Sequence, residues 1–455
     1  MQVSIKWLKD YIDFTETPEE LAEKLTMAGV PVENITTLGQ NVDNVVSGKI
    51  LKIDKHPNAD RLSVCQIDVG KEILTIVTGA TNVKENDIVP VALVGAKLPG
   101  GIKITKSKLR GVESSGMLCS VEELDLDKKM LEPEVCEGIF LLPTETELGV
   151  DVKTILGLDD VILEFELTAN RADCFSVMGL VREIAVLTGK EFKKPEISVS
   201  ESGKNATDLI KIEIADTSVC KRFAARVFEN IKIEASPNWM KQRLEAAGIR
   251  SINNIVDITN FVMLELGQPL HAYDYDTIKG KTLIATKANP NEKITTLDDV
   301  ERNLTEEMIV IADISGPVGV AGIMGGLATE VTANTKTIVL EAATFQGVSV
   351  RRTSRAFGLR SEASGRFERG VDIVNIDKVL DRAAHLIQQL NAGVPCSGVV
   401  DVYPEPIGVT EISVTTAEIN DYLGSNTTEN EIVNILEKLE FKVKVDQTLL
   451  ITAPS

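Results

Sequence analysis

The stretch NNIVDITNFVMLELGQPLHAYD, residues 253–274, is the part of the sequence most informative about the fold. Read as a helix, it carries an apolar stripe on one face and amide and carboxylate side chains on another. Gly267 ends the helix, Pro269 prevents it from resuming, and the next turn carries His271, one of three histidines among 455 residues. We interpret the segment as the wall of a site; a surface helix followed by a capped loop is the alternative. The stripe contains Ile255, Ile258, Val262 and Leu266, and the polar face contains Asn253, Asp257 and Asn260.

Composition indicates an ordinary globular chain of several domains. The 455 residues are too many for one core, so three or four domains are expected. No apolar run reaches 18 residues, and MQVSIKWLKDYIDF has no signal-peptide pattern, so we expect a cytoplasmic protein without a membrane span. The six cysteines include no C-x-x-C pair, which indicates neither a zinc site nor a disulfide framework, and no bound metal is expected.

The charge distribution restricts where nucleic acid could bind. A net charge of −20 argues against binding by the whole surface, because phosphate binding needs clustered cations. Two basic segments are present: KLPGGIKITKSKLR, residues 97–110, and RRTSRAFGLRSEASGRFERG, residues 351–370, with six arginines. Arginine forks suit phosphates and carboxylates, although an arginine face paired with neighbouring acids is the alternative.

Hydrophobic periodicity predicts a multidomain α+β fold. Residues 1–38 are predicted to form two helices, the second starting with a capping box at Thr17. Short Val- and Ile-rich runs in residues 39–150 are typical of a small barrel, for which an OB-fold is the natural candidate. Residues 151–200 return to helix, with Asp173 as a possible cap. Residues 206–400 mix strands and helices, and residues from about 407 follow the order strand, helix, helix, two short strands.

Seven motifs, in this order and spacing, resemble the beta subunit of bacterial-type phenylalanyl-tRNA synthetase, and the resemblance covers the entire chain. The motifs are SIKWLKDYIDF (4–14), HPNADRLSVCQIDVG (56–70), LTANRADCFSVMGLVREIAVLTG (167–189), the opening stretch at 253–274, AGIMGG (321–326), EAATF (341–345) and SEASGRFERGVD (361–372).

The resemblance implies a domain order. An OB-fold tRNA-binding domain, residues 39–150, would be inserted in a small helical or α+β N-terminal domain made of residues 1–38 and 151–200. A large α+β editing domain, residues 206–400, would follow, and residues 407–455 would form part of a winged-helix-like module. The family continues beyond this point into an acidic magnesium-binding stretch, so we expect a truncated chain.

The resemblance also implies the function. The chain would bind tRNA(Phe), support aminoacylation by an alpha subunit in an alpha2beta2 enzyme, and hydrolyse mischarged Tyr-tRNA(Phe). ATP and Mg²⁺ are expected for the full enzyme and no cofactor for this fragment, which has no G-x-x-x-x-G-K-[ST] phosphate loop. A non-catalytic tRNA-binding and assembly scaffold is the alternative, and a stand-alone RNA chaperone is a third possibility.

The same resemblance suggests roles for individual residues. Glu341 would accept the tyrosine hydroxyl, Ala363 would leave room for its ring, and His271 would help to place water or RNA. Ser361 would supply a hydroxyl where the family often has threonine. Read alone, Glu341 could instead pair with Arg351 or Arg355. The expected pocket backbone is Gly322, Gly325, Gly326 and Asn254, and the expected tRNA-binding side chains are Lys97, Lys103, Lys106, Lys108, Arg110, Arg360 and Arg366.

Overall fold

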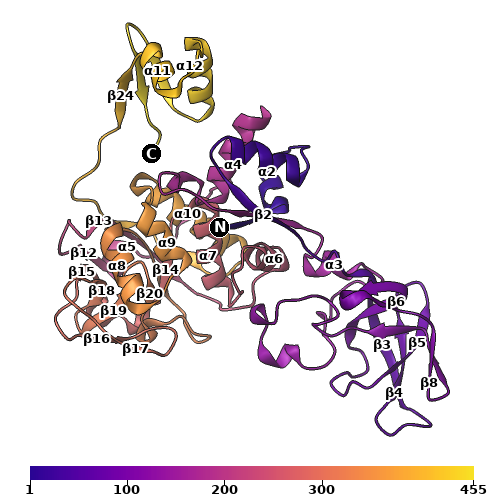
Figure 1. The fold of residues 1–455 in the computed structure, drawn as a ribbon. Helices are drawn as coiled ribbons and strands as arrows, with labels where there is room; N and C mark the ends of the chain where they lie inside the picture. The colour runs from indigo at the N-terminus through magenta and orange to yellow at the C-terminus, as the bar shows by residue number, and fades with distance from the viewer.

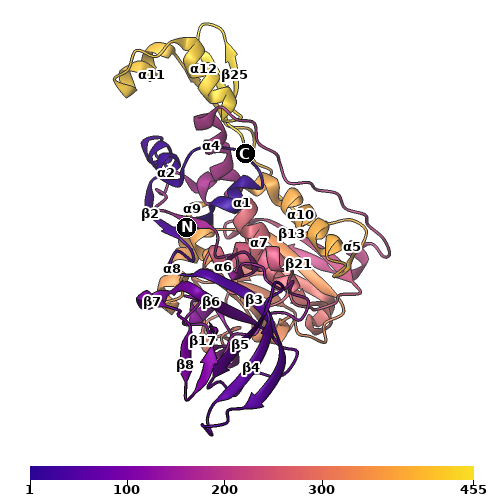
Figure 2. The same cartoon turned by 90° about the vertical axis from the view of Figure 1, so that its right-hand side faces the viewer.

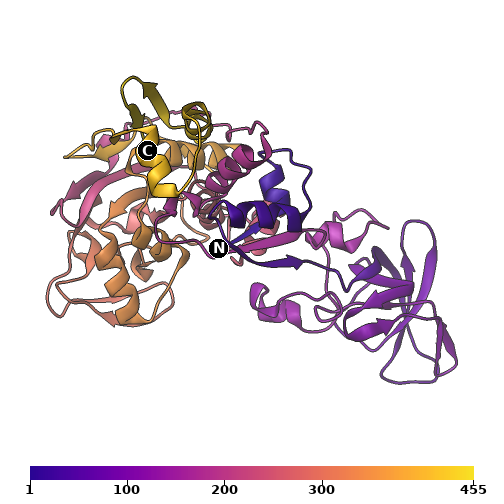
Figure 3. The same ribbon diagram turned by 45° about the horizontal axis from the view of Figure 1, so that its top comes forward.

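The computed structural model describes residues 1–455, which form a central body with two smaller parts projecting from it (Figure 1). The barrel part and the C-terminal part leave the body in different directions (Figure 1), and the turned view shows the barrel part extending away from the body (Figure 3). None of the helices has the length and apolar character needed to cross a bilayer.

Parts of residues 1–38 and 151–200 fold together in one part of the body. Strand β11 lies between β1 and β2 in a three-stranded antiparallel sheet, helices α1 and α2 pack against it, and α4 packs against those two helices. The two predicted helices at 1–38 are therefore accompanied by two strands that the sequence analysis missed. The elements are β1 (Gln2–Ser4), α1 (Ile5–Lys9), α2 (Pro18–Met27), β2 (Val32–Thr37), β11 (Val161–Phe165) and α4 (Val177–Thr188).

Local signals explain the ends of these helices. Thr17 and Glu20 form the predicted capping box of α2, and Gly189 ends α4 in the left-handed conformation. The cap of α4 is Ser176, which accepts a hydrogen bond from Gly179 N, and not Asp173 as predicted. Asp173 is held instead in a short turn by Arg171, at 2.8 Å.

The predicted barrel region folds as a six-stranded antiparallel sheet in the order β10-β6-β3-β4-β5, with β7 paired to β6. Strand β10 also lies against β5, so the sheet curves back on itself (Figure 2). The longer strands of this sheet coincide with the short Val- and Ile-rich runs from which strands were predicted. Its strands are β3 (Asp43–Lys55), β4 (Ser63–Asp68), β5 (Ile73–Thr78), β6 (Ile88–Leu98), β7 (Ile102–Lys103) and β10 (Gly116–Leu118); β8 (Ser107–Leu109) and β9 (Val112–Ser114) form a separate hairpin.

The large unit contains two main sheets, and three of its helices pack together on one of them. One sheet has the order β12-β15-β18-β19-β20 and the other β14-β21-β13-β22. The strands are β12 (Lys211–Ile214), β13 (Cys220–Glu229), β14 (Leu270–Asp274), β15 (Thr282–Lys287), β18 (Ile309–Asp313), β19 (Gly316–Val320), β20 (Met324–Gly325), β21 (Ile338–Phe345) and β22 (Val394–Pro395). The helices are α6 (Asn238–Ala246), α7 (Asn254–Leu266) and α10 (Ile376–Gln389).

The large unit and the N-terminal unit share one apolar core. Buried side chains run without a break from Trp7 through Leu180 and Ile258 to Leu380. A second core fills the space between the two sheets of the large unit. The body therefore behaves as one packed block, and β14 and β21 lie between its two cores.

Helix α7 corrects the interpretation of the opening stretch. It ends as predicted at Gly267, the left-handed C-cap, whereas Asn253 is its N-cap and not part of its polar face. Its polar face is not the wall of a site, because Asp257 is fully buried and accepts hydrogen bonds from Ser236 (2.5 Å), Ser251 and the backbone of Ile252 (2.9 Å). The helix is not on the surface either, so the alternative is also wrong.

The C-terminal part is a small module connected by an extended segment (Figure 1). Its three-stranded sheet has the order β24-β26-β25, and two helices complete it in the predicted sequence of elements. The elements are β24 (Glu411–Val414), α11 (Thr416–Leu423), α12 (Glu429–Lys438), β25 (Lys442–Val445) and β26 (Leu449–Thr452).

Candidate functional site

Two neighbouring strands bring together the two most distinctive predicted residues. In the β14–β21 pair, His271 is directly opposite Glu341, although 70 positions separate them in the sequence. Directly opposed residues point to the same face of a sheet. Tyr273 follows His271 on that face, because side chains alternate along a strand.

These side chains line a cavity of about 90 Å³ between the two sheets and the short helix α9 (Glu362–Arg369). Ala363 and Phe367 of α9 form one wall, and the turn that joins β19 to β20 forms another. Glu341, His271 and Ala363 therefore share one hollow, which is mostly apolar apart from the carboxylate, the imidazole and the Tyr273 hydroxyl. The lining is completed by Pro269, Leu270, Ile311, Gly319, Val320, Ala321, Gly322, Ile323, Met324, Gly325 and Phe345.

Two positions in the AGIMGG turn require glycine, because neighbouring side chains lie too close to leave room for a Cβ atom. A Cβ on Gly325 would lie 2.4 Å from the His271 ring, and a Cβ on Gly322, whose φ is +71°, would lie 2.8 Å from Phe367. Gly326 does not line the cavity, because its added Cβ would meet the carbonyl oxygen of Val318 at 2.5 Å inside the sheet.

Glu341 is a buried carboxylate without a cationic partner. Its hydrogen bond comes from the Tyr273 hydroxyl, and it pairs with neither Arg351 nor Arg355. Burial raises the pKa of Glu341 to about 7, and the hydrogen bond from Tyr273 opposes that rise. The carboxylate therefore titrates near neutral pH.

His271 is the imidazole of the cavity. Its ring is edge-on to that of Tyr273, with centroids 4.6 Å apart, whereas the hydrogen-bonded histidine rings of the protein are those of His56 and His385. Burial lowers the pKa of His271 to about 4. At neutral pH the ring is uncharged and has a lone pair that can accept a proton or hydrogen bond.

Two other predicted residues have structural roles and do not line the cavity. Ser361 is the N-cap of α9 and donates to the carbonyl of Ile323 at 3.2 Å, so it holds the cavity turn without lining the cavity. Asn254 does not form the rim, because it donates to Lys232 O at 2.8 Å and accepts from Glu234 N at 3.2 Å. Both are buttressing positions rather than contact positions.

The arginine segment divides into exposed and enclosed members. Arg360 is exposed at the start of α9. Arg366 is only 1% exposed, pairs with Glu362 at 2.7 Å and stacks on the Phe175 ring at 4.6 Å. The prediction that Arg366 contacts RNA is therefore corrected: it joins α9 to the N-terminal unit.

The basic residues of the barrel part form an exposed group around β6, β7 and the β8–β9 hairpin. Lys97 is opposite Lys103 in the β6–β7 pair, while Lys106 has an acidic partner, Glu113, at 2.6 Å. The HPNADR motif supports this hairpin, a role the sequence did not reveal: His56 Nε2 lies 3.0 Å from Leu109 O, and Asn58 donates to Arg110 O at 3.1 Å. The exposed group consists of Lys97, Lys103, Lys106, Lys108 and Arg110.

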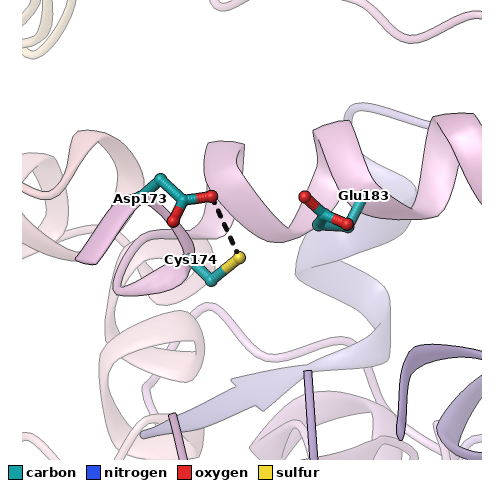
Figure 4. Close-up of side chains that lie close together, drawn as sticks. All are labelled: Asp173, Cys174 and Glu183. Atoms are coloured by element: carbon teal, nitrogen blue, oxygen red, sulfur yellow. Dashed lines mark hydrogen bonds between the residues drawn. The ribbon is translucent and has the colours of Figure 1, made fainter. Parts of the chain in front are cut away.

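One cluster outside the cavity has metal-ligand residue types. Asp173, Cys174 and Glu183 lie close together at the base of α4 (Figure 4). The guanidinium of Arg171 already lies among them, with Nη2 2.8 Å from Asp173, 2.6 Å from Glu183 and 2.9 Å from the Cys174 sulfur. A cation in that position occupies the place that a metal ion would need.

Comparison with known proteins gives matches over both the barrel and the cavity unit. Family models match as a putative tRNA binding domain over residues 45–149 and a B3/4 domain over residues 219–392. The phenylalanine–tRNA ligase beta subunit of Moorella thermoacetica is 48% identical over 455 residues, 100% of this chain and 56% of that protein. The subunit of the same name from Clostridium acetobutylicum is 47% identical over 98% of this chain and 56% of that protein.

Among solved structures, an N-terminal fragment of the phenylalanyl-tRNA synthetase beta subunit from Pyrococcus horikoshii matches 65% of this chain and 82% of that chain. Its sequence identity is 15% and its TM-score 0.32.

The two domain matches and the sequence relatives place the chain among aminoacyl-tRNA ligase proteins. Within that class, the chain belongs to the phenylalanine–tRNA ligase beta-subunit family. It spans about half the length of the curated relatives it matches, 56% in the first two.

Proposed function

We propose that this chain binds tRNA(Phe) and hydrolyses Tyr-tRNA(Phe) in the Glu341 cavity, as the beta subunit of a phenylalanine–tRNA ligase. The observation that carries the proposal is the convergence of Glu341, His271 and Ala363 on one hollow. A second, hydrolytic site is useful for this enzyme class, because an apolar amino-acid pocket discriminates against a substrate with an added hydroxyl group only about 100-fold.

The cavity has the groups that such a hydrolytic site needs. Ala363 and the glycines of the turn leave room for an aromatic ring, and the Glu341 carboxylate can accept its hydroxyl hydrogen bond. Phenylalanine cannot donate that bond, so its ester would be held less well. The uncharged His271 ring can accept a hydrogen bond from water as the water attacks the ester carbonyl and the ribose oxygen leaves.

The ring must displace some lining atoms to enter. A volume of about 90 Å³ is smaller than the roughly 150 Å³ in which an engineered protein holds benzene. Met324 lines the cavity, is half-buried and has an unbranched, flexible side chain, so it is the lining residue best able to move.

The remaining parts of the chain support the same function. Residues 39–150 form an OB-fold that binds tRNA, inserted between residues 1–38 and 151–200 of an N-terminal domain. Residues 206–400 form the editing domain, and residues 407–455 form part of a winged-helix-like module. Amino-acid activation takes place on an alpha subunit, in a cytoplasmic alpha2beta2 enzyme that uses ATP and Mg²⁺. The metal-type cluster at Asp173 already holds Arg171 and does not fit that ion.

A deacylation assay separates this function from a non-catalytic scaffold. The full-length subunit, assembled with its alpha partner, is expected to release tyrosine from purified Tyr-tRNA(Phe) much faster than buffer does. Release at the rate of spontaneous ester hydrolysis would contradict editing and would favour the scaffold.

The exposed lysines of the barrel part are expected to contribute to tRNA affinity. Neutralising Lys103, Lys106 and Lys108 together should weaken binding and reduce the slope of log K against log salt by about 2, because Lys106 is already paired with Glu113. The measurement is a salt titration of tRNA binding to the assembled enzyme. Its matched control is neutralisation of Lys211, Lys287 and Lys293, three exposed, ion-paired lysines of the large unit. An equal slope for the two variants would exclude the barrel lysines from the interface.

A further inference from the structure

The Tyr273 hydroxyl is the polar group of the cavity that the proposed function leaves unexplained. It donates to Oε2 of Glu341, the same carboxylate that the tyrosine substrate would use. We propose that Tyr273 is a positioning residue that sets specificity: it holds Oε2 of Glu341 and thereby presents Oε1 to the substrate hydroxyl as an acceptor. This inference rests on the proposed editing function.

The two carboxylate oxygens differ in their surroundings. Oε2 is satisfied by Tyr273. Oε1 makes no hydrogen bond. Unlike the unpartnered Gln268 Oε1 and Thr344 Oγ1, it is not fully enclosed by protein atoms. Because Glu341 lines the cavity, Oε1 is the oxygen that remains open to it.

The strand pair fixes the position of the Tyr273 ring. Tyr273 is 1% exposed, and His271, its neighbour on the same face of β14, packs edge-on against it. The hydroxyl therefore reaches the carboxylate from the neighbouring strand while the cavity side of Glu341 stays free. A phenylalanine at this position would fill the same space without holding the carboxylate.

The charge state of Glu341 depends on few neighbours. The titratable groups facing it are His271 and Tyr273 from β14 and Cys220 from β13, and none of them supplies a positive charge at neutral pH. Burial raises the pKa of Tyr273 well above its ordinary value, so its hydroxyl remains a donor. The Tyr273 hydrogen bond is thus the interaction that favours the ionised carboxylate, which only accepts hydrogen bonds.

The test is Tyr273→Phe in the full-length subunit assembled with its alpha partner. At pH 7 the variant should need about tenfold more Tyr-tRNA(Phe) for half-saturation of hydrolysis, with the rate at saturation nearly unchanged. The pH at which hydrolysis reaches half its plateau should move upward, because the Glu341 pKa rises when the hydroxyl is lost. Tyr275→Phe is the matched control, since its hydroxyl donates to Leu209 O, away from the cavity.

The possible results are distinguishable. Tyr273→Phe could show wild-type half-saturation and wild-type pH dependence of hydrolysis while Glu341→Ala loses activity. That result would overturn the role of Tyr273 and leave the editing function intact. Tighter substrate binding by Tyr273→Phe would also overturn it, because Tyr273 would then compete with the substrate.

The contact between Tyr273 and Glu341 can also be tested without measuring hydrolysis. If the wild-type enzyme does not hydrolyse Tyr-tRNA(Phe), the proposed function fails. An infrared titration of the Glu341 carboxyl band, assigned by its loss in Glu341→Gln, still tests the contact. The pH midpoint of this titration is expected to be higher in Tyr273→Phe than in the wild type, and an unchanged midpoint would overturn the inference.

Discussion

Ala363→Trp should lower the hydrolysis of Tyr-tRNA(Phe) by the assembled enzyme at least about 100-fold, while Phe-tRNA synthesis changes less than about twofold. Ala363 is the smallest side chain on the α9 wall of a cavity of only about 90 Å³. An indole ring would occupy the space that the substrate ring needs. The measurement is single-turnover deacylation of Tyr-tRNA(Phe), with aminoacylation measured in parallel.

Ala356→Trp is the matched control for this substitution. Ala356 belongs to the neighbouring helix α8 (Gly347–Phe357) and is exposed, so an indole ring there should leave hydrolysis unchanged. Undiminished hydrolysis in Ala363→Trp would remove α9 from the editing site.

Glu265→Ala is expected to have the largest effect on stability, lowering the free energy of unfolding of the body by about 3–5 kcal/mol. Glu265 is fully buried, binds Arg382 through two hydrogen bonds of 2.8 and 2.9 Å, and accepts a third from the Tyr11 hydroxyl. Its removal leaves a buried guanidinium and a buried hydroxyl without an acceptor. The loss should be shared by the N-terminal and large units, because Tyr11 and Arg382 belong to different units.

Denaturant unfolding followed by tryptophan fluorescence measures this loss directly. The chain has two tryptophans, and both Trp7 and Trp239 contact the Phe261 ring in the shared core, at 4.7 and 5.4 Å between centroids. Asp10→Ala, which breaks the more exposed pair with Arg243 at 3.0 Å, is the control and should cost less than about 1 kcal/mol. An equal loss in both variants would contradict a dominant role for the buried network.

Most elements of the fold could be predicted because their signals are local. Short Val- and Ile-rich runs predicted strands within residues 39–150, and β5, which spans Ile73–Thr78, is one of them. The missed strands β1 and β2 have weaker local signals. The first has three residues, and the burial of the second does not alternate, so their pairing with β11 depends on contacts more than 120 positions away.

The candidate site was only partly predictable for the same reason. The residue types and motifs indicated His271, Glu341 and Ala363, and the strand register explains how two of them come to face each other. Tyr273 had no distinguishing signal, because an aromatic residue in a strand is ordinary core material. The burial of Arg366 depends on Phe175, nearly 200 positions earlier, so local sequence suggested an exposed cation.

The Asn253 to Asp274 stretch shows how a polar pattern can mislead. Its polar residues were interpreted as the wall of a site, but Asp257 accepts hydrogen bonds from Ser236, just before α6, and from Ser251 and the backbone of Ile252, between α6 and α7. The part of the stretch that lines the cavity is its end, where the stop at Gly267 allows β14 to begin and to place His271 beside Glu341.

The most direct test of discrimination by Glu341 is the ratio of hydrolysis rates for Tyr-tRNA(Phe) and Phe-tRNA(Phe), measured for the assembled wild-type enzyme and for Glu341→Ala. We expect the wild-type enzyme to prefer the tyrosyl ester at least roughly 10³-fold, and the variant to lose nearly all of that preference through slower tyrosyl hydrolysis. An undiminished preference in Glu341→Ala would show that another group recognises the hydroxyl, and would contradict the assignment of this cavity.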